Sequence, residues 1–558
     1  MSAEPRVKRL HQILFWPLRL MPMGDAPGAP RRPWELLLAD PDQPWREVVD
    51  EYTGETASFH ERHYQEFVTF LPYVQRFLYG EGRGAPGGVG GNVAGDVAGS
   101  SGLKVLRRDD VATLRLRTRP EAAPLLLEVV HIDLYFFFDV DVVILNVELA
   151  CGELALAQAQ ELMYRLGRAY PSGWDAQGLP LHTLAEAAWL DRAGRVLAAS
   201  DAGERERFLS HVAQHRAPRL SAHWDFLLRP LRSDHSSDDA VPPQALRFRQ
   251  IEYYRMPMMA YLALDEPQAL TRADFVRLGL VTGADALDAQ ELPFGAQHLE
   301  DFEQRYCYDR FWHAGGAAPY TRYLCSGHAL VVVGRADAEF FCCRDRGVLA
   351  QFRHQHQLIF LIAHFQKAAL LMFADRLVEA LRRLNVNDAD NVRRFKRAIR
   401  ASFEGFLRFS HRYWFHEVAE QAQTRALFRL CARHLELDPL YAEVKSRISD
   451  MSAYLETDSI RRQANTVVRL TVVTIFGMVG TITTGFLGMN LLAEAEAPLW
   501  RRLLVFGVTL VATIGLTVYT MAKSKRLSDF LDVLSDERLS PGLKWRAFWA
   551  VWRPGGEP

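Results

Sequence analysis

Two uncharged stretches lie close together near the end of this 558-residue chain. Residues 470–487 are 18 residues without a charge, and residues 503–522 are 20. As helices that rise about 1.5 Å per residue, they would be roughly 27 and 30 Å long, and each length is about one hydrocarbon core. The pattern therefore predicts two transmembrane helices joined by a short loop.

A second apolar pattern precedes the first of these stretches. Asp438 and Pro439 suit the N-cap and first turn of a helix, and residues 440–476 contain no Gly or Pro. Apolar residues then recur at intervals of three and four, at Tyr441, Val444, Ile448, Met451 and Leu455. Such a repeat is typical of a helix packed against parallel neighbours. We therefore expect one helix from Pro439 to about Asn490, roughly 78 Å long.

The rest of the chain mixes strand and helix patterns. Strand patterns occur at residues 125–149, interrupted by a turn at 139–141, and a second strand pair is expected at 328–343; helix patterns occur at 154–170 and 348–384. Strands and helices interspersed in this way favour an α+β fold class for the middle of the chain.

The predicted organisation has five parts. A glycine-rich linker at 80–102 has too few large apolar residues to offset its ordering entropy by burial. The parts are an N-terminal extension with this linker (1–110), an α/β domain with a long helical extension (111–435), a stalk helix (436–469), a two-helix transmembrane pore domain (470–522) and a cytosolic tail (523–558).

Charge and cysteine content narrow the function classes. The net charge is -1, so nothing in the composition points to nucleic acid. The six cysteines lack C-x-x-C spacing, which favours a reducing cytosol for the bulk of the chain. The basic residues that flank the two spans are Arg461, Arg462, Arg469, Lys523, Lys525 and Arg526. They predict that both termini are cytoplasmic, although Arg501 and Arg502 in the loop weaken that orientation.

The first span is unusually rich in Gly and Thr. With a helical period of 3.6, one narrow face consists of Leu470, Thr474, Met478, Thr481, Gly485 and Gly488. Such a face suits a lining surface between neighbouring helices. The alternative is that these small residues only permit close helix packing.

The end of this span carries the tripeptide Gly488-Met489-Asn490. A long N-terminal region, a long helix entering the first of two terminal spans, G-M-N at the end of that span, a short loop and a basic tail K-S-K-R together resemble the CorA family of magnesium channels. The resemblance covers about residues 440–526. One departure is Leu487, where family members usually have an aromatic residue.

The resemblance implies a cytosolic α/β/α domain and a homopentamer in the bacterial inner (plasma) membrane. Five first-span helices would line one pore, and Asn490 would form an amide ring at its outer mouth. Leu470, Met478 and Thr481 fit the family's pore rings. The expected ligands and partners are Mg²⁺ and other divalent cations, membrane lipid and further copies of this chain, with no organic cofactor.

Several acidic residues are weaker candidates. Glu494 and Glu496 in the loop could concentrate cations at the mouth, or could be solvated loop charges. In the family, carboxylates act as ion sensors between subunits, and Asp450, Glu456 and Asp458 on the stalk are candidates for that role. Their alternative interpretation is the solvated face of a long helix.

Other chemistry has little support in the sequence. The pairs His60/His63 and His354/His356 lack the companions of a metal site. There is no P-loop or G-x-S-x-G motif, so we do not expect an enzyme. The alternatives that stay open are a Zn²⁺, Co²⁺ or Ni²⁺ transporter of the same superfamily and a membrane-anchored signalling protein without transport. The sequence leaves open the ion preference, the gating and the role of the Trp-rich tail.

Overall fold

The computed structural model describes residues 5–21, 32–48, 61–80, 101–234, 246–252, 254–283, 295–382, 384, 389–488, 498–501, 503–508, 511–515 and 519. The chain divides into two compact units, Met1–Ile448 and Ser449–Pro558. The glycine-rich linker lies mostly outside the described residues, because residues 81–100 are not among them.

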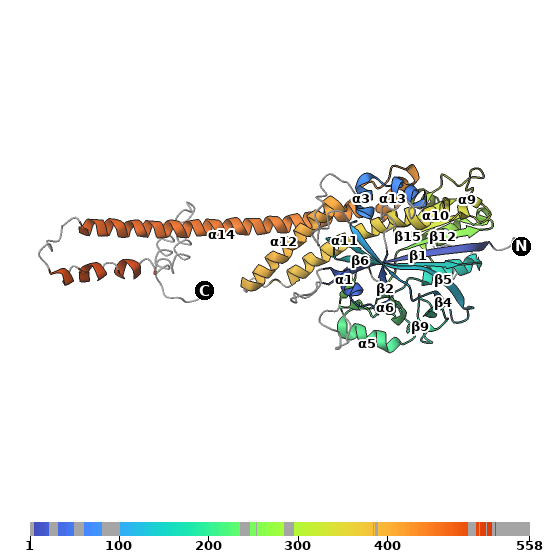
Figure 1. The fold of residues 1–558 in the computed structure, drawn as a ribbon, viewed down its shortest axis with the longest axis horizontal. Coiled ribbons are helices and arrows are strands. Elements are labelled where there is room, and N and C mark those ends of the chain that lie inside the picture. Colours follow the sequence, from blue (N-terminus) through green and yellow to red (C-terminus); the bar gives the residue numbers. More distant parts are fainter. Residues whose placement is uncertain are drawn as a thin grey trace. The chain divides into compact units, whose positions relative to one another are not determined.

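The first unit is a mixed α+β fold, as the sequence predicts, built on one large sheet (Figure 1). The strands are β1 (Arg6–Leu20), β2 (Trp45–Glu47), β3 (Leu103–Arg108), β4 (Thr113–Arg117), β5 (Leu125–Phe137), β6 (Val142–Cys151), β7 (Leu154–Ala155), β8 (Glu186–Leu190), β9 (Val196–Ala199), β10 (Arg232–Ser233), β11 (Arg247–Gln250), β12 (Met258–Leu264), β13 (Cys307–Tyr308), β14 (Arg322–Cys325) and β15 (Ala329–Arg335). The main strand order is β13-β14-β15-β12-β1-β6-β5-β4-β8-β9.

Helices of the first unit lie on both faces of this sheet. In chain order, the labelled helices of the described residues are α1 (Pro33–Leu38), α2 (Glu61–Thr69), α3 (Pro72–Tyr79), α4 (Leu156–Arg165), α5 (Arg205–His215), α6 (Ala222–Leu228), the 3-10 turn η1 (Pro267–Ala269), α7 (Arg272–Leu280), α8 (Ala296–Tyr306), α9 (Glu339–Cys342), α10 (Val348–Gln351), the π-helical turn η2 (Phe352–His356), α11 (Gln357–Arg382), α12 (Ala389–Arg412), α13 (Ala422–His434) and α14 (Leu437–Gly488). One face carries the main apolar core together with α4, α6 and α7. The opposite face carries α11, where Phe360 packs on Phe15 of β1 and Phe365 stacks on Phe137 of β5.

The β5–β6 hairpin confirms the strands that were expected around a turn at 139–141. Asp139 takes a left-handed conformation there, with φ 63°, which Asp tolerates in tight turns better than most residues do. Facing residues pair in antiparallel register from Phe136–Val143 to Glu128–Ala150.

The N-terminal segment corrects the expectation of an extension at 1–110. Residues 6–20 form β1, which pairs with β6 along ten residues and lies at the centre of the sheet. The interior Pro17 is unusual in such a strand, because it lacks an N–H donor. It falls between Leu14, the last residue paired with β12, and Leu18, the first paired with β11. Pro17 therefore occupies the place where β1 changes partner on that side.

Two further expectations need correction. The strand pair expected at 328–343 is a single strand, β15, because residues 339–342 form α9; β15 pairs in parallel with β12 and antiparallel with β14. The helix expected at 154–170 is shorter: α4 ends at Arg165, and Gly167 follows with φ 78°. A left-handed glycine commonly stops a helix in this way.

One helical stretch among the described residues is long and apolar enough to cross a membrane, and it is Val348–Arg382, which comprises α10, η2 and α11. Of its most apolar window, 78% is buried in the first unit, as expected for the core helix of a globular domain. A shorter apolar stretch runs from Thr466 to Met478 in α14. The second expected span, 503–522, is described only in part.

Candidate functional site

The expected stalk is present as one uninterrupted helix. α14 runs 52 residues from Leu437 to Gly488, which at about 1.5 Å per residue is roughly 78 Å. The sequence placed its start at Pro439, two residues later than the structure does. Arg461 and Arg462, where a break would have argued against the stalk, lie inside the helix.

The beginning of the apolar repeat in α14 is covered by the chain itself. Val444 and Ile448 are only 1% and 2% exposed. Tyr441 stacks on Trp414 and Phe406 at ring distances of 4.4 and 5.6 Å. The repeat was expected to need neighbouring copies, but at these positions the first unit supplies the partner surface. Packing between copies therefore cannot use Val444 or Ile448.

The proposed lining face is exposed in the single chain. Leu470 and Met478 are 67% and 59% exposed, and Thr474, Thr481, Gly485 and Gly488 are exposed as well. On the other side of the helix, Val472 is buried and Phe476 and Gly480 are half-buried. These three residues repeat every four positions, roughly 150° around the helix from the lining face.

One contact on the covered side of the helix involves Gly480. A Cβ placed on Gly480 would meet Cγ2 of Thr513 at 3.1 Å, so the segment that contains Thr513 approaches the helix backbone closely there. Glycine permits such close approach between helices. In this chain the small residue at 480 thus serves helix packing, while the small residue at 485 has nothing within 4 Å. Close helix packing therefore accounts for Gly480, and the lining role of the opposite face stays a prediction.

The threonines of this region have their hydroxyl protons bound within the helix. Thr474 Oγ1 donates to the carbonyl of Leu470 at 2.8 Å, and Thr481 Oγ1 donates to that of Gly477 at 2.9 Å. A hydroxyl that donates backward keeps its oxygen lone pairs available. A ring of such hydroxyls could accept hydrogen bonds from the water shell of a cation.

The remaining predicted pore residues lie outside the described residues. These are Met489 and Asn490 of the tripeptide and Glu494 and Glu496 of the loop. Of the stalk carboxylates, Asp450 is exposed, whereas Glu456 and Asp458 belong to α14 with side chains that are not described. The structure therefore places the helix that leads to the tripeptide, and the tripeptide's geometry stays a prediction.

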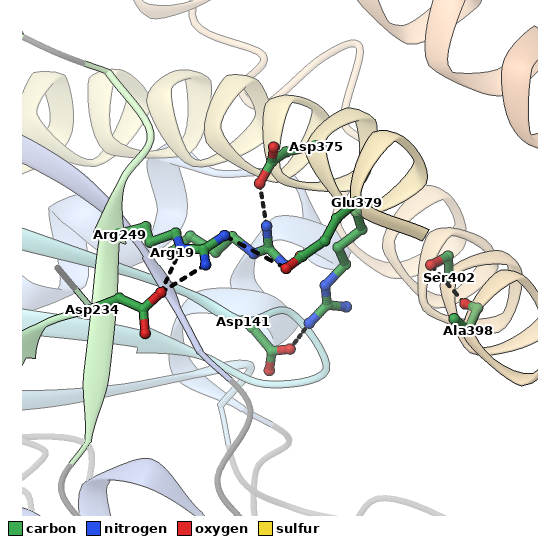
Figure 2. Close-up of polar contacts among 9 residues, drawn as sticks. Arg19, Asp141, Asp234, Arg249, Asp375, Glu379, Ala398 and Ser402 are labelled. Atoms are coloured by element: carbon green, nitrogen blue, oxygen red, sulfur yellow. Dashed lines mark hydrogen bonds and ion pairs between the residues drawn. The ribbon is translucent and has the colours of Figure 1, made fainter. Parts of the chain in front are cut away.

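Carboxylates of the first unit are held by arginines where α11 meets the sheet (Figure 2). Arg19 of β1 binds both Asp375 and Glu379 of α11, at 2.9 Å from Nη2 to Glu379. Arg249 of β11 lies 2.7 Å from Asp234 and 3.6 Å from Glu379. The further ion pair is Arg376 with Asp141. This cluster borders a cavity of about 650 Å³ between α11 and α12.

The arginines of this cluster leave its carboxylates poorly suited to bind a cation. Within the described residues no three His, Cys, Asp or Glu side chains gather as a metal site.

A second buried ion pair fixes the start of α11. Arg353 of the π-helical turn donates from Nε and Nη2 to Glu148 of β6, and the Nη2 distance is 3.4 Å. Burial alone would raise the pKa of Glu148, but the hydrogen bonds from His11 and Arg353 lower it to about 2. Glu148 is therefore ionised at neutral pH and anchors the turn.

Two of the histidines that the sequence left without companions, His63 and His354, acquire a shared carboxylate in the fold. His354 Nδ1 lies 3.4 Å from Glu66 of α2, and His63 also acts on that carboxylate. Burial would raise the pKa of Glu66, but the bonds from His354 and Tyr79 lower it. Spacing could not predict this group, because Glu66 and His354 are far apart in the sequence.

Comparisons with known proteins give no family assignment. A scan against models of known families finds no match to this chain. A search of curated proteins finds none either. The resemblance to the CorA family therefore depends on the residues of the 440–526 region.

Proposed function

We propose that this protein is a divalent-cation channel of the CorA type that passes hydrated Mg²⁺ through a homopentameric pore. The observation that carries the proposal is α14, an unbroken helix whose back packs against the second apolar segment while the face that leads to G-M-N stays exposed. An exposed stripe of Thr and Gly in an uncharged segment is explained if copies of the helix surround water.

The chemistry of this face suits a hydrated ion. Mg²⁺ gives up its water shell reluctantly, so neutral amide and hydroxyl oxygens can hold its waters without replacing them. Carboxylates in the narrowest part would bind the ion too tightly for it to leave. In the proposal, Asn490 supplies amides at the outer mouth and Thr481 supplies hydroxyls deeper in the pore. Gly485 leaves room between them.

The proposed setting is a bacterial inner membrane with both termini in the cytoplasm. The potential there is negative inside and is worth about 2.3 kcal/mol per charge per 100 mV, hence about 4.6 kcal/mol for a divalent ion. Transport down this potential requires no catalysed reaction, so the proposal includes no enzymatic activity.

Uptake by reconstituted protein tests the proposal. Full-length protein in liposomes, with an internal Mg²⁺ indicator and an imposed inside-negative potential, should take up Mg²⁺. Asn490→Ala should abolish uptake and leave assembly intact. Ile475→Ala is the matched control, since Ile475 is half exposed on the same helix but lies away from the lining face.

Two outcomes would overturn the assignment. Wild-type uptake by Asn490→Ala would remove the proposed filter. No flux of any cation from the wild-type protein under any gradient would favour the membrane-anchored signalling protein. Competition by Ni²⁺, Co²⁺ and Zn²⁺ in the same assay would decide which ion is preferred.

A further inference from the structure

Two arginines face each other where the chain leaves α4 and enters β12. Arg168 and Arg255 form an isolated antiparallel bridge. The backbone bonds beside it run from Met256 N to Gly167 O (2.8 Å) and from Ala169 N to Tyr254 O (3.2 Å). This pattern makes Arg168 and Arg255 a non-hydrogen-bonded pair, the kind whose side chains lie closer together. Like charges directly opposite each other destabilise a sheet.

The Arg168 side chain is buried but incompletely bonded. Arg168 is 5% exposed, and its Nε donates to the carbonyl of Tyr164 at 3.1 Å. Its guanidinium lies over the rings of Tyr254 and Tyr164, at 4.5 and 5.1 Å. The two Nη atoms make no hydrogen bond to any described residue.

The surroundings of the pair are positive. Arg255 Nη2 donates to the carbonyl of Val281 at 2.6 Å, and no carboxylate of a described residue acts on either guanidinium. Burial and the nearby Arg168 lower the pKa of Arg255 to about 9. His328 is close enough that both arginines, after burial, lower its pKa to about 3, and its Nε2 is buried without a partner among the described residues.

The backbone around the pair is strained. Tyr254 has φ 72° and Val281 has φ 51°. A left-handed conformation is costly for these residues, and for the β-branched valine above all. Strain of this kind persists only where the surroundings enforce it, and it concentrates at functional sites.

We propose that Arg168 and Arg255 form a binding site for a phosphate-type oxyanion. An oxyanion placed between the two guanidinium groups would accept hydrogen bonds from the free Nη atoms of Arg168 and would replace the like-charge repulsion with two charge-assisted contacts. Arginine suits this role because its planar fork matches the geometry of phosphate oxygens. The site belongs to the cytosolic unit and does not depend on the proposed transport function.

The test is the effect of inorganic phosphate on full-length protein in an uncharged detergent, at constant ionic strength. Phosphate should raise the Tm of the wild-type protein by roughly 2–4 °C at saturation and should bind measurably in calorimetry. Arg168→Gln and Arg255→Gln should each weaken that binding at least about tenfold. Without phosphate, Arg168→Gln should keep or raise the Tm, because it removes the repulsion.

The opposite results would overturn the site. If Arg168 serves only to stack on the tyrosines, Arg168→Gln lowers the Tm in phosphate-free buffer and the phosphate response persists. Failure of the wild-type protein to bind phosphate also rejects it. Arg205→Gln, at an exposed position on α5, is the control that should behave as wild type. If a glutamine variant does not fold, Arg168→Lys and Arg255→Lys keep the charge but lose the fork, and should retain only weakened binding.

A parallel titration identifies the source of the oxyanion. Binding of ATP more than about tenfold tighter than binding of free phosphate would assign the group to a nucleotide. Equal or weaker binding of ATP would assign it to free phosphate. Both results support the site, and transport assays on the same samples report separately on the channel.

Discussion

The chain contains two apolar helical regions whose side chains differ in how far they are buried. The stretch from Val348 to Arg382 is mostly buried in the first unit, and two of its interior polar side chains find backbone partners there: His364 Nε2 lies 3.1 Å from the carbonyl of Gly327, and Gln366 donates to that of Tyr413 at 3.0 Å. The last part of α14 keeps Leu470 and Met478 exposed in the single chain. Hydropathy alone does not separate them, but the partners of their side chains do.

The two apolar regions also differ in the charged residues that they contain. The buried stretch is tied to the sheet by Arg353–Glu148 at its start and by Arg19 with Asp375 and Glu379 near its end. Residues 470–487 have no charge at all. A core helix can carry ion pairs at its boundaries because the domain supplies counter-ions, whereas a membrane-spanning segment has none available in hydrocarbon.

The largest effect is expected from the packing of α11. Phe365 is fully buried and stacks on Phe137 at a ring distance of 3.8 Å. Phe365→Ala should lower the free energy of unfolding of the first unit by about 3–5 kcal/mol, because it leaves a cavity that the neighbours cannot fill. Urea unfolding followed by tryptophan fluorescence measures this. Ile475→Ala in α14 should leave that transition unchanged, and an equal loss in both variants would contradict the contrast between the helices.

Lysine substitutions on the two sides of α14 should have nearly as large an effect, and the effect should differ between the sides. A lysine near the centre of a membrane span costs about 2.5–3.5 kcal/mol where it faces lipid. Ile475→Lys should therefore reduce membrane insertion and assembly. Met478→Lys lies on the proposed lining face, so it should assemble and block Mg²⁺ flux by repulsion. Light scattering in detergent measures assembly, and flux into liposomes measures transport. Loss of assembly in both variants would reject the proposed lining face.

The ion pair that begins α11 should make stability depend on acid pH. The pKa of Glu148 is about 2 in the fold and about 4.3 in an unfolded chain. Since the folded value is the lower one, its contribution of about 3 kcal/mol is fully present above roughly pH 5 and is lost as the pH falls toward 2. Glu148→Gln should be less stable than wild type at pH 7 and should show a flatter profile between pH 5 and 2. Parallel profiles of the two proteins would show that this pair does not govern acid stability.

Local patterns predicted much of this molecule, and the misses have identifiable causes. The apolar repeat and the absence of Gly and Pro identified α14, and a turn between β-rich runs identified β5 and β6. β1 was missed because Arg, Lys, His and an interior proline interrupt RVKRLHQILFWPLRL, although the fold pairs Arg6, Lys8 and Arg19 with carboxylates and places the proline at a change of strand partner. Ion pairs such as Arg353–Glu148 join residues 205 positions apart, and no local pattern predicts them. Met489 and Asn490 of the G-M-N tripeptide follow the end of α14 at Gly488 and are outside the described residues.

The smallest effect is expected at Asp450, where α14 passes from its buried beginning toward the exposed segment. Asp450 is exposed, so Asp450→Asn should change stability by no more than about 0.5 kcal/mol. Intracellular Mg²⁺ could close the proposed pore by binding between cytosolic units. An ion shifts the equilibrium between the open and closed states only by its differential affinity for them, so several carboxylates must contribute to binding. Removing one carboxylate should then raise the Mg²⁺ concentration for half-closure by less than about tenfold. The measurement is current through reconstituted protein as Mg²⁺ on the cytosolic side rises from micromolar to millimolar. A wild-type conductance that stays constant over that range would show that the channel is not gated by its own ion, and the continuous helix would then serve only to carry the cytosolic unit.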